Sequence, residues 1–144
     1  MNGQAIFLPM LATMTLTAVV WFYMYARRIP AMYRVGLVAQ TYTTPDKTTE
    51  HLPAEVNYSA NNFKNLCELP ILFYGLTLYL FVTQNVDAIY VAAAWGFFAL
   101  RTLHSIVHCT KNIVMLRFYL YVGSSMVLWF MLGRALITEI AVYL

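Results

Sequence analysis

The segment that decides the fold is residues 88–109, AIYVAAAWGFFALRTLHSIVHC, in which Arg101 is the single Lys, Arg, Asp or Glu. At a rise of ~1.5 Å per residue, about 20 helical residues cross the ~30 Å hydrocarbon core of a bilayer. Three further stretches have the same apolar character and sufficient length, and they are residues 4–26, 58–82 and 114–137. The sequence therefore predicts four membrane-spanning helices in a single membrane domain that occupies the whole chain, 1–144.

The composition agrees with this prediction. Of the 144 residues, 61% are hydrophobic and 10% are charged, whereas soluble domains carry about 25% charged residues. The composition therefore argues against a water-soluble fold, and a net charge of +3 is too small to indicate nucleic-acid binding. The two cysteines, Cys67 and Cys109, provide neither a disulfide framework nor a paired zinc motif. We expect an all-α, four-helix membrane bundle.

The connections between the spans predict its topology and orientation. The links after the second and third spans are about four residues long, so consecutive helices should run antiparallel, up and down. The one long connection, residues 27–57, is polar and is predicted to be a cytoplasmic loop. Basic residues favour the cytoplasmic side, and this arrangement leaves both termini on the non-cytoplasmic side. Eight of the nine basic residues then lie toward the cytoplasm, and Arg134 is the exception.

Polar side chains within the predicted spans fall on one face of each helix, because spacings of three, four and seven residues repeat a helical face. They are Asn61, Asn65 and Glu68 in the second span, Arg101, His104 and His108 in the third, and Arg117 and Tyr121 in the fourth. Up-and-down topology places all three sets in the cytoplasmic half, level with Arg27 and Arg28 at the end of the first span. Pro70 lacks an N–H for the carbonyl of Leu66, which predicts a kink beside this group.

Two interpretations of this polar group remain open. Glu68 could pair with Arg101 and lock the helices together, with the amides and imidazoles as interhelical hydrogen-bonding groups. Alternatively, the surplus positive charge binds an anionic ligand, because a buried cation without a counter-charge is costly.

Other kinds of site fit the spacing less well. His104 and His108 could hold one metal ion from a single helix, but the chain has only one further histidine, His51, so the sequence predicts no metal site. Bis-histidine haem ligation needs imidazoles on opposite faces of the ring, which two residues on one helix face do not provide. A proton-coupled exporter could use Glu68, although neighbouring arginines would repel a cationic substrate.

The polar motifs resemble those of one family. They are Ala26–Arg27–Arg28 at the end of the first span, Asn65 through Glu68 in the second, Arg101 through His104 with His108 in the third, and Arg117 through Tyr121 in the fourth. Together, in this order and over essentially the whole length, they resemble the MAPEG family, the membrane-associated proteins in eicosanoid and glutathione metabolism. The sequence departs from the family pattern at Phe118, where some members carry a serine.

This resemblance implies a homotrimer that binds glutathione between neighbouring subunits, as co-substrate, and acts on lipophilic electrophiles or hydroperoxides. The glutathione-binding residues it implies are Arg27, Asn65, Glu68, Arg101, His104 and Tyr121, together with His108, which stands where many relatives have tyrosine. Arg117 and Arg28 match arginines that assist the chemistry. The alternative is a non-catalytic relative that serves as a scaffold or accessory subunit of a larger membrane complex, in contact with other membrane proteins.

Overall fold

The computed structural model describes residues 3–36, 40 and 44–144, with the side chains of 45 and 46 excepted, and this part of the chain is helical apart from short connections. The helices are η1 (Gly3–Ile6), α1 (Phe7–Val35), α2 (Pro45–His51), α3 (Ala54–Leu66), α4 (Leu69–Val82), α5 (Ala88–Cys109) and α6 (Val114–Tyr143). Within these residues, four helical segments are long and apolar enough to cross a membrane: Gly3–Val35, Ala54–Val82, Ala88–Cys109 and Val114–Tyr143. The chain is therefore a multi-pass integral membrane protein with a helical bundle.

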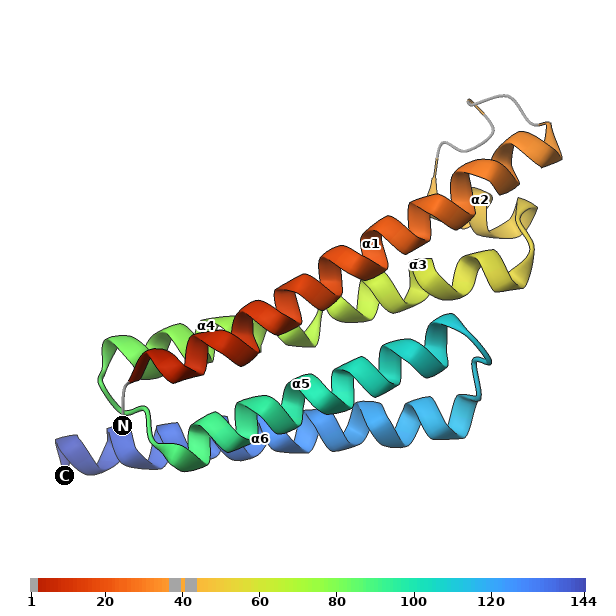
Figure 1. Cartoon of the computed structure of the whole chain (residues 1–144). Helices are drawn as coiled ribbons and strands as arrows, with labels where there is room; N and C mark the ends of the chain where they lie inside the picture. Colours follow the sequence, from red (N-terminus) through yellow and green to blue (C-terminus); the bar gives the residue numbers. More distant parts are fainter. Residues whose placement is uncertain (1–2, 37–39, 41–43) are drawn as a thin grey trace.

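The helices form an elongated bundle in which α5 and α6 pack along each other (Figure 1). Helix α1 packs against α3 at one side and α5 at another, and α4 contacts both α1 and α6. Both termini lie at one end of the bundle, while α2 and the turn between α5 and α6 lie toward the other end (Figure 1). We call these the terminal end and the α2 end.

The buried side chains differ between the two ends. An apolar core lies toward the terminal end, where the rings of Phe73 and Phe97 stack with centroids 4.4 Å apart. Toward the α2 end, the buried residues of α5 are instead polar, and they include Arg101, His104 and His108. Because buried polar groups in a membrane bundle are costly without partners, this half of the molecule is where a ligand site is to be sought.

The second span is broken at Cys67–Glu68. Helix α3 ends at Leu66, and α4 begins at Leu69 with Pro70 in its first turn. Pro70 has no N–H to donate to the carbonyl of Leu66, so the ladder of helical hydrogen bonds cannot continue through this point. The predicted kink at Pro70 is confirmed, and it takes the form of a non-helical pair of residues between two helices.

Helices extend further into the segment 27–57 than its prediction as a loop allows. Helix α1 continues through Pro30 to Val35 and ends at Gly36, whose left-handed φ of 68° suits glycine. Within the same segment, α2 begins where the hydroxyl of Thr44 accepts a hydrogen bond from the amide of Lys47, and α3 begins at Ala54. The prediction failed here because it followed hydropathy, and a helix can continue after its sequence has become polar.

An ion pair joins the start of α5 to α6 near the terminal end. Asp87 caps α5 by accepting a hydrogen bond from the amide of Tyr90, at 3.0 Å. The same carboxylate accepts two hydrogen bonds from Arg134, at 2.9 and 2.5 Å. Arg134 is the basic residue that the sequence assigns to the opposite face from the others, and it pairs locally there.

Candidate functional site

A polar cleft with a volume of about 450 Å³ opens between α3, α5 and α6, beside the turn that joins α5 to α6. The residues that line it are Asn61, Lys64, Asn65, Glu68, His104, His108, Val114, Arg117, Phe118 and Tyr121. The structure thus brings together six of the seven predicted site residues of the second, third and fourth spans, all except Arg101: Asn65, Glu68, His104, His108, Arg117 and Tyr121. Their common helical faces, read from spacing alone, do converge.

The break in the second span contributes to this convergence. Asn61, Lys64 and Asn65 come from α3, whereas Glu68 lies in the break itself, with φ −99° and ψ −89°. The side chain of Glu68 is exposed to the cleft, and within the described residues no basic side chain forms an ion pair with it. The cleft therefore presents one carboxylate together with the charges of Lys64 and Arg117.

Arg117 is fixed by three hydrogen bonds that link α5, α6 and the turn between them. Its Nη1 donates to the Oδ1 of Asn112 at 2.9 Å and lies 2.7 Å from the Nε2 of His108. The Nδ1 of His108 lies 3.4 Å from the Nε2 of His104, and the Nδ1 of His104 lies 2.9 Å from the carbonyl oxygen of Arg117. The contacts through the two histidines thus form a closed cycle that begins and ends at Arg117.

Asn112 belongs to this site although the sequence reasoning did not select it. Its φ of 48° lies in the left-handed region, which asparagine tolerates better than most residues. Its backbone N–H donates to the carbonyl oxygen of Val107 at 2.8 Å, which closes the end of α5. The signal available in the sequence was an asparagine in a four-residue link between two helices, which is a common place for such a turn.

Arg101 lies behind the cleft. Its side chain is 0% exposed, and its guanidinium carbon lies 4.5 Å from the centroid of the Tyr121 ring and 5.5 Å from that of Phe97. Among the described residues, no hydrogen-bond partner is present for any of its three side-chain nitrogens, and the ion pair with Glu68 considered from the sequence is not formed. Cation–π stacking stabilises a desolvated guanidinium by ~2 kcal/mol or more, but the rings supply neither a hydrogen-bond acceptor nor a counter-charge.

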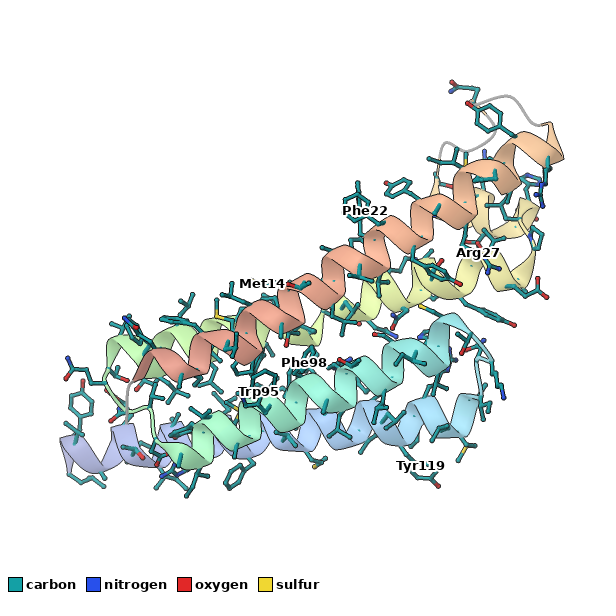
Figure 2. The ribbon with its side chains drawn as sticks, in the orientation of Figure 1. Met14, Phe22, Arg27, Trp95, Phe98 and Tyr119 are labelled. Carbon is teal, nitrogen blue, oxygen red and sulfur yellow. The ribbon has the colours of Figure 1, made fainter. Side chains whose placement is uncertain are left out.

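Arg27 and Arg28 lie outside the cleft of their own chain. Arg27, labelled in Figure 2, donates to the hydroxyl of Tyr23 at 3.2 Å. It lines a separate hollow of about 380 Å³ between α1 and α3, which it shares with Arg34. Arg28 is half-buried, and its Nε lacks a hydrogen-bond partner within the described part of the chain. The structure of one chain therefore does not bring these two predicted residues to the other members of the set.

An apolar groove of about 460 Å³ lies between α4 and α6, and the sequence reasoning did not identify it. It begins at Ile71 and Leu72, one helical turn after Glu68, and extends along α6 past Trp129 to Glu139. At its far end the hydroxyl of Tyr79 donates to a carboxylate oxygen of Glu139. Since α4 follows the break and α6 lines both hollows, the polar cleft and the apolar groove lie in succession along the same two spans.

Comparison with known proteins identifies one family. A family model described as the MAPEG family matches residues 6–137, a range that includes every residue lining the polar cleft. No curated protein and no solved structure matches the chain.

Proposed function

The chain belongs to the MAPEG family, and from that premise we propose that it is a glutathione-dependent transferase or peroxidase acting on lipophilic electrophiles or hydroperoxides. In this proposal the bundle is antiparallel, three copies form a homotrimer, and both termini lie on the non-cytoplasmic side of the membrane. Glutathione binds as co-substrate in the polar cleft.

The unpartnered guanidinium of Arg101 is the observation that carries the proposal. A cation that is 0% exposed and has no hydrogen-bond partner among the described residues costs several kcal/mol unless an anion completes its environment. Glutathione offers two carboxylates, and arginine holds carboxylates through paired, charge-assisted hydrogen bonds. The residues present fit this ligand in chemical type. Arg101 is not part of the cleft lining, so its contact with the ligand would require the Tyr121 ring that covers it to turn aside.

The other charges in the cleft have matching roles in this proposal. Lys64 would bind the second carboxylate of glutathione, while Glu68 would bind its ammonium group. Asn65 and Tyr121 would supply neutral hydrogen bonds. Arg27 and Arg28, which lie outside the cleft of their own chain, would reach the cleft of a neighbouring subunit, so that trimer formation completes the site.

Arg117 would stabilise the negative charge of the bound thiol. When bound, glutathione supplies its sulfur as the nucleophile, and the thiolate is the reactive form. A fixed cation near the sulfur favours that form. Both side-chain hydrogen bonds of Arg117 among the described residues are made by Nη1, so its Nη2 and Nε remain without partners there. Arg28 of the neighbouring subunit would stabilise charge that develops on the acceptor.

The apolar groove between α4 and α6 would hold the lipophilic acceptor. Its lining is apolar except for Tyr79 and Glu139 near its far end, and it begins one helical turn from Glu68. A substrate dissolved in the bilayer could therefore approach the cleft along the surface of α6 without crossing water.

The ammonium contact provides a specific test. Detergent-purified protein should bind glutathione more tightly than an analogue that lacks only the α-amino group, and the variant Glu68→Gln should bind both equally. Isothermal titration calorimetry measures the four affinities, with Glu139→Gln on α6 as the matched control. If the wild-type protein binds neither compound at millimolar concentration, the glutathione proposal is wrong.

A non-catalytic scaffold is the second candidate, and Phe118 favours it. Its side chain follows Arg117 directly, is 55% exposed and lines the cleft, so an apolar ring occupies the position at which some relatives carry a serine hydroxyl. Such a protein would bind partners through its exposed apolar faces. A thiol spectrum without a thiolate band for bound glutathione at neutral pH would support this candidate over the enzyme.

A further inference from the structure

Arg117, His108 and His104 form a closed cycle of hydrogen bonds, which we call the histidine network. The distances around it are 2.7 Å from Arg117 Nη1 to His108 Nε2, 3.4 Å from His108 Nδ1 to His104 Nε2, and 2.9 Å from His104 Nδ1 to the carbonyl of Arg117. The two imidazole rings stand edge to face, with centroids 5.4 Å apart. Both histidines are buried, at 2% and 3% exposure.

The two contacts with Arg117 in the histidine network determine which nitrogen of each imidazole carries the proton. Arginine has only N–H donors, so the Nε2 of His108 must accept, and the proton of a neutral His108 is on Nδ1. That proton is donated to the Nε2 of His104, which leaves the proton of His104 on its own Nδ1. A carbonyl oxygen only accepts, so the last contact requires the same arrangement independently.

We propose that His104 and His108 are positioning residues for Arg117, both neutral and both in the Nδ1–H tautomer. All four imidazole nitrogens make hydrogen bonds within the histidine network, so neither side chain has a free donor or acceptor for a ligand. Their role differs from direct glutathione binding, which the resemblance to the family implies for His104 and His108.

The hydrogen bonds at Nη1 fix the direction of the Arg117 guanidinium relative to the cleft. Nη1 has two hydrogens, and His108 and Asn112 accept both of them. The remaining N–H groups of Arg117, on Nη2 and Nε, are thereby held at the cleft that Arg117 and His108 line together. This consequence rests on the proposed function, because it is the thiolate of bound glutathione that these groups would meet.

Nitrogen-15 NMR of protein labelled at histidine tests the proton arrangement without any ligand. His104 and His108 should each show a protonated Nδ1 and an unprotonated Nε2 at neutral pH. His51, exposed on α2, is the internal control and should exchange between tautomers. Signals are assigned with His104→Asn, which keeps a donor near the position of Nδ1, and His108→Gln, which keeps an acceptor near that of Nε2.

A functional measurement then separates positioning from packing. His108→Leu should lower kcat for thiol transfer about tenfold, the effect of losing one charge-assisted hydrogen bond, and leave KM for glutathione within about threefold. His108→Gln should recover most of the loss, because its amide oxygen can still accept from Arg117. An Nε2–H tautomer or a tautomer mixture at His104 or His108 would overturn the inference, as would equal activity of the Leu and Gln variants when both fold.

The two proposals can fail separately. If the tautomers are as described but glutathione does not bind, the proposed histidine network is supported and the proposed function is wrong. If glutathione binds as a thiolate while the histidines exchange tautomers freely, the proposed function stands and the positioning role is wrong.

Discussion

Replacing Arg101 with methionine should stabilise the free protein and weaken glutathione binding. Methionine keeps a long, flexible side chain between the rings of Phe97 and Tyr121 but removes the charge. In the free protein the guanidinium is 0% exposed and has no hydrogen-bond partner among the described residues, so its removal relieves a desolvation cost. In the complex, the same removal leaves a carboxylate of the ligand without its partner.

The two effects differ in size as well as in sign. An uncompensated buried charge costs ~3–5 kcal/mol, and the stacking of Arg101 on two rings offsets ~2 kcal/mol of this cost. We expect the free energy of unfolding of Arg101→Met to rise by about 1–3 kcal/mol. Two charge-assisted hydrogen bonds contribute ~3 kcal/mol or more, so the Kd for glutathione should rise about 100-fold.

Urea unfolding in detergent and isothermal titration calorimetry measure these two quantities. Arg134→Met is the matched control, because Arg134 is paired with Asp87 near the opposite end of the bundle. It should lose about 1 kcal/mol of stability or less and bind glutathione normally. Destabilised Arg101→Met protein with an unchanged Kd would refute the reasoning, since Arg101 would then be a structural residue with a partner other than the ligand.

Three further predictions concern other parts of the molecule. The hydrogen bond from Arg134 lowers the pKa of Asp87 from 3.8 to about 2; stability should therefore be complete above about pH 4 and fall between pH 4 and pH 2, because the unfolded chain binds the proton more readily there. The side chains are 33% and 43% exposed, so the loss should be about 1 kcal/mol at most, and Asp87→Asn should abolish it in acid titrations of unfolding. Pro70→Leu restores an N–H for the carbonyl of Leu66, so the break at Glu68 should close and the Kd for glutathione measured by calorimetry should rise about tenfold, the loss of one charge-assisted contact; an unchanged Kd would show that the break does not place Glu68. Phe118→Ser adds a hydroxyl beside Arg117 and should increase the ultraviolet thiolate band of bound glutathione about threefold or more, as hydrogen bonds to charged groups do, whereas Phe118→Ala should not; equal bands in the two variants would exclude the hydroxyl as the cause.

The spans could be predicted because lipid imposes a length and a composition on them. The third span, Ala88–Cys109, has the helical bounds that hydropathy gives. The end of α1 at Val35 could not be found in this way, because helical hydrogen bonds continue beyond the apolar residues as far as the glycine that ends them. Hydropathy reports where a helix suits lipid, and the backbone decides where it stops.

The candidate site was predictable to the extent that it depends on helical spacing. Glu68, His104 and Arg117 do converge on one cleft, as their spacing and the order of the spans predict. Spacing gives the direction of a side chain but not what covers it, so the position of Arg101 behind Tyr121 depends on how α6 packs and could not be predicted. Similarly, spacing does not tell which chain's cleft a residue such as Arg27 serves.

The two arginines of α6 have a mechanical consequence for the bundle. Arg117 holds the end of α5 through His108, and Arg134 holds its beginning through Asp87. Helices α5 and α6 are thus fastened at both ends and should move as one rigid hairpin. The opposite wall of the cleft has a joint instead, the non-helical pair Cys67–Glu68. If the cleft widens to admit a bulky ligand, α3 should therefore move about the hinge at Cys67–Glu68, while the α5–α6 hairpin stays fixed.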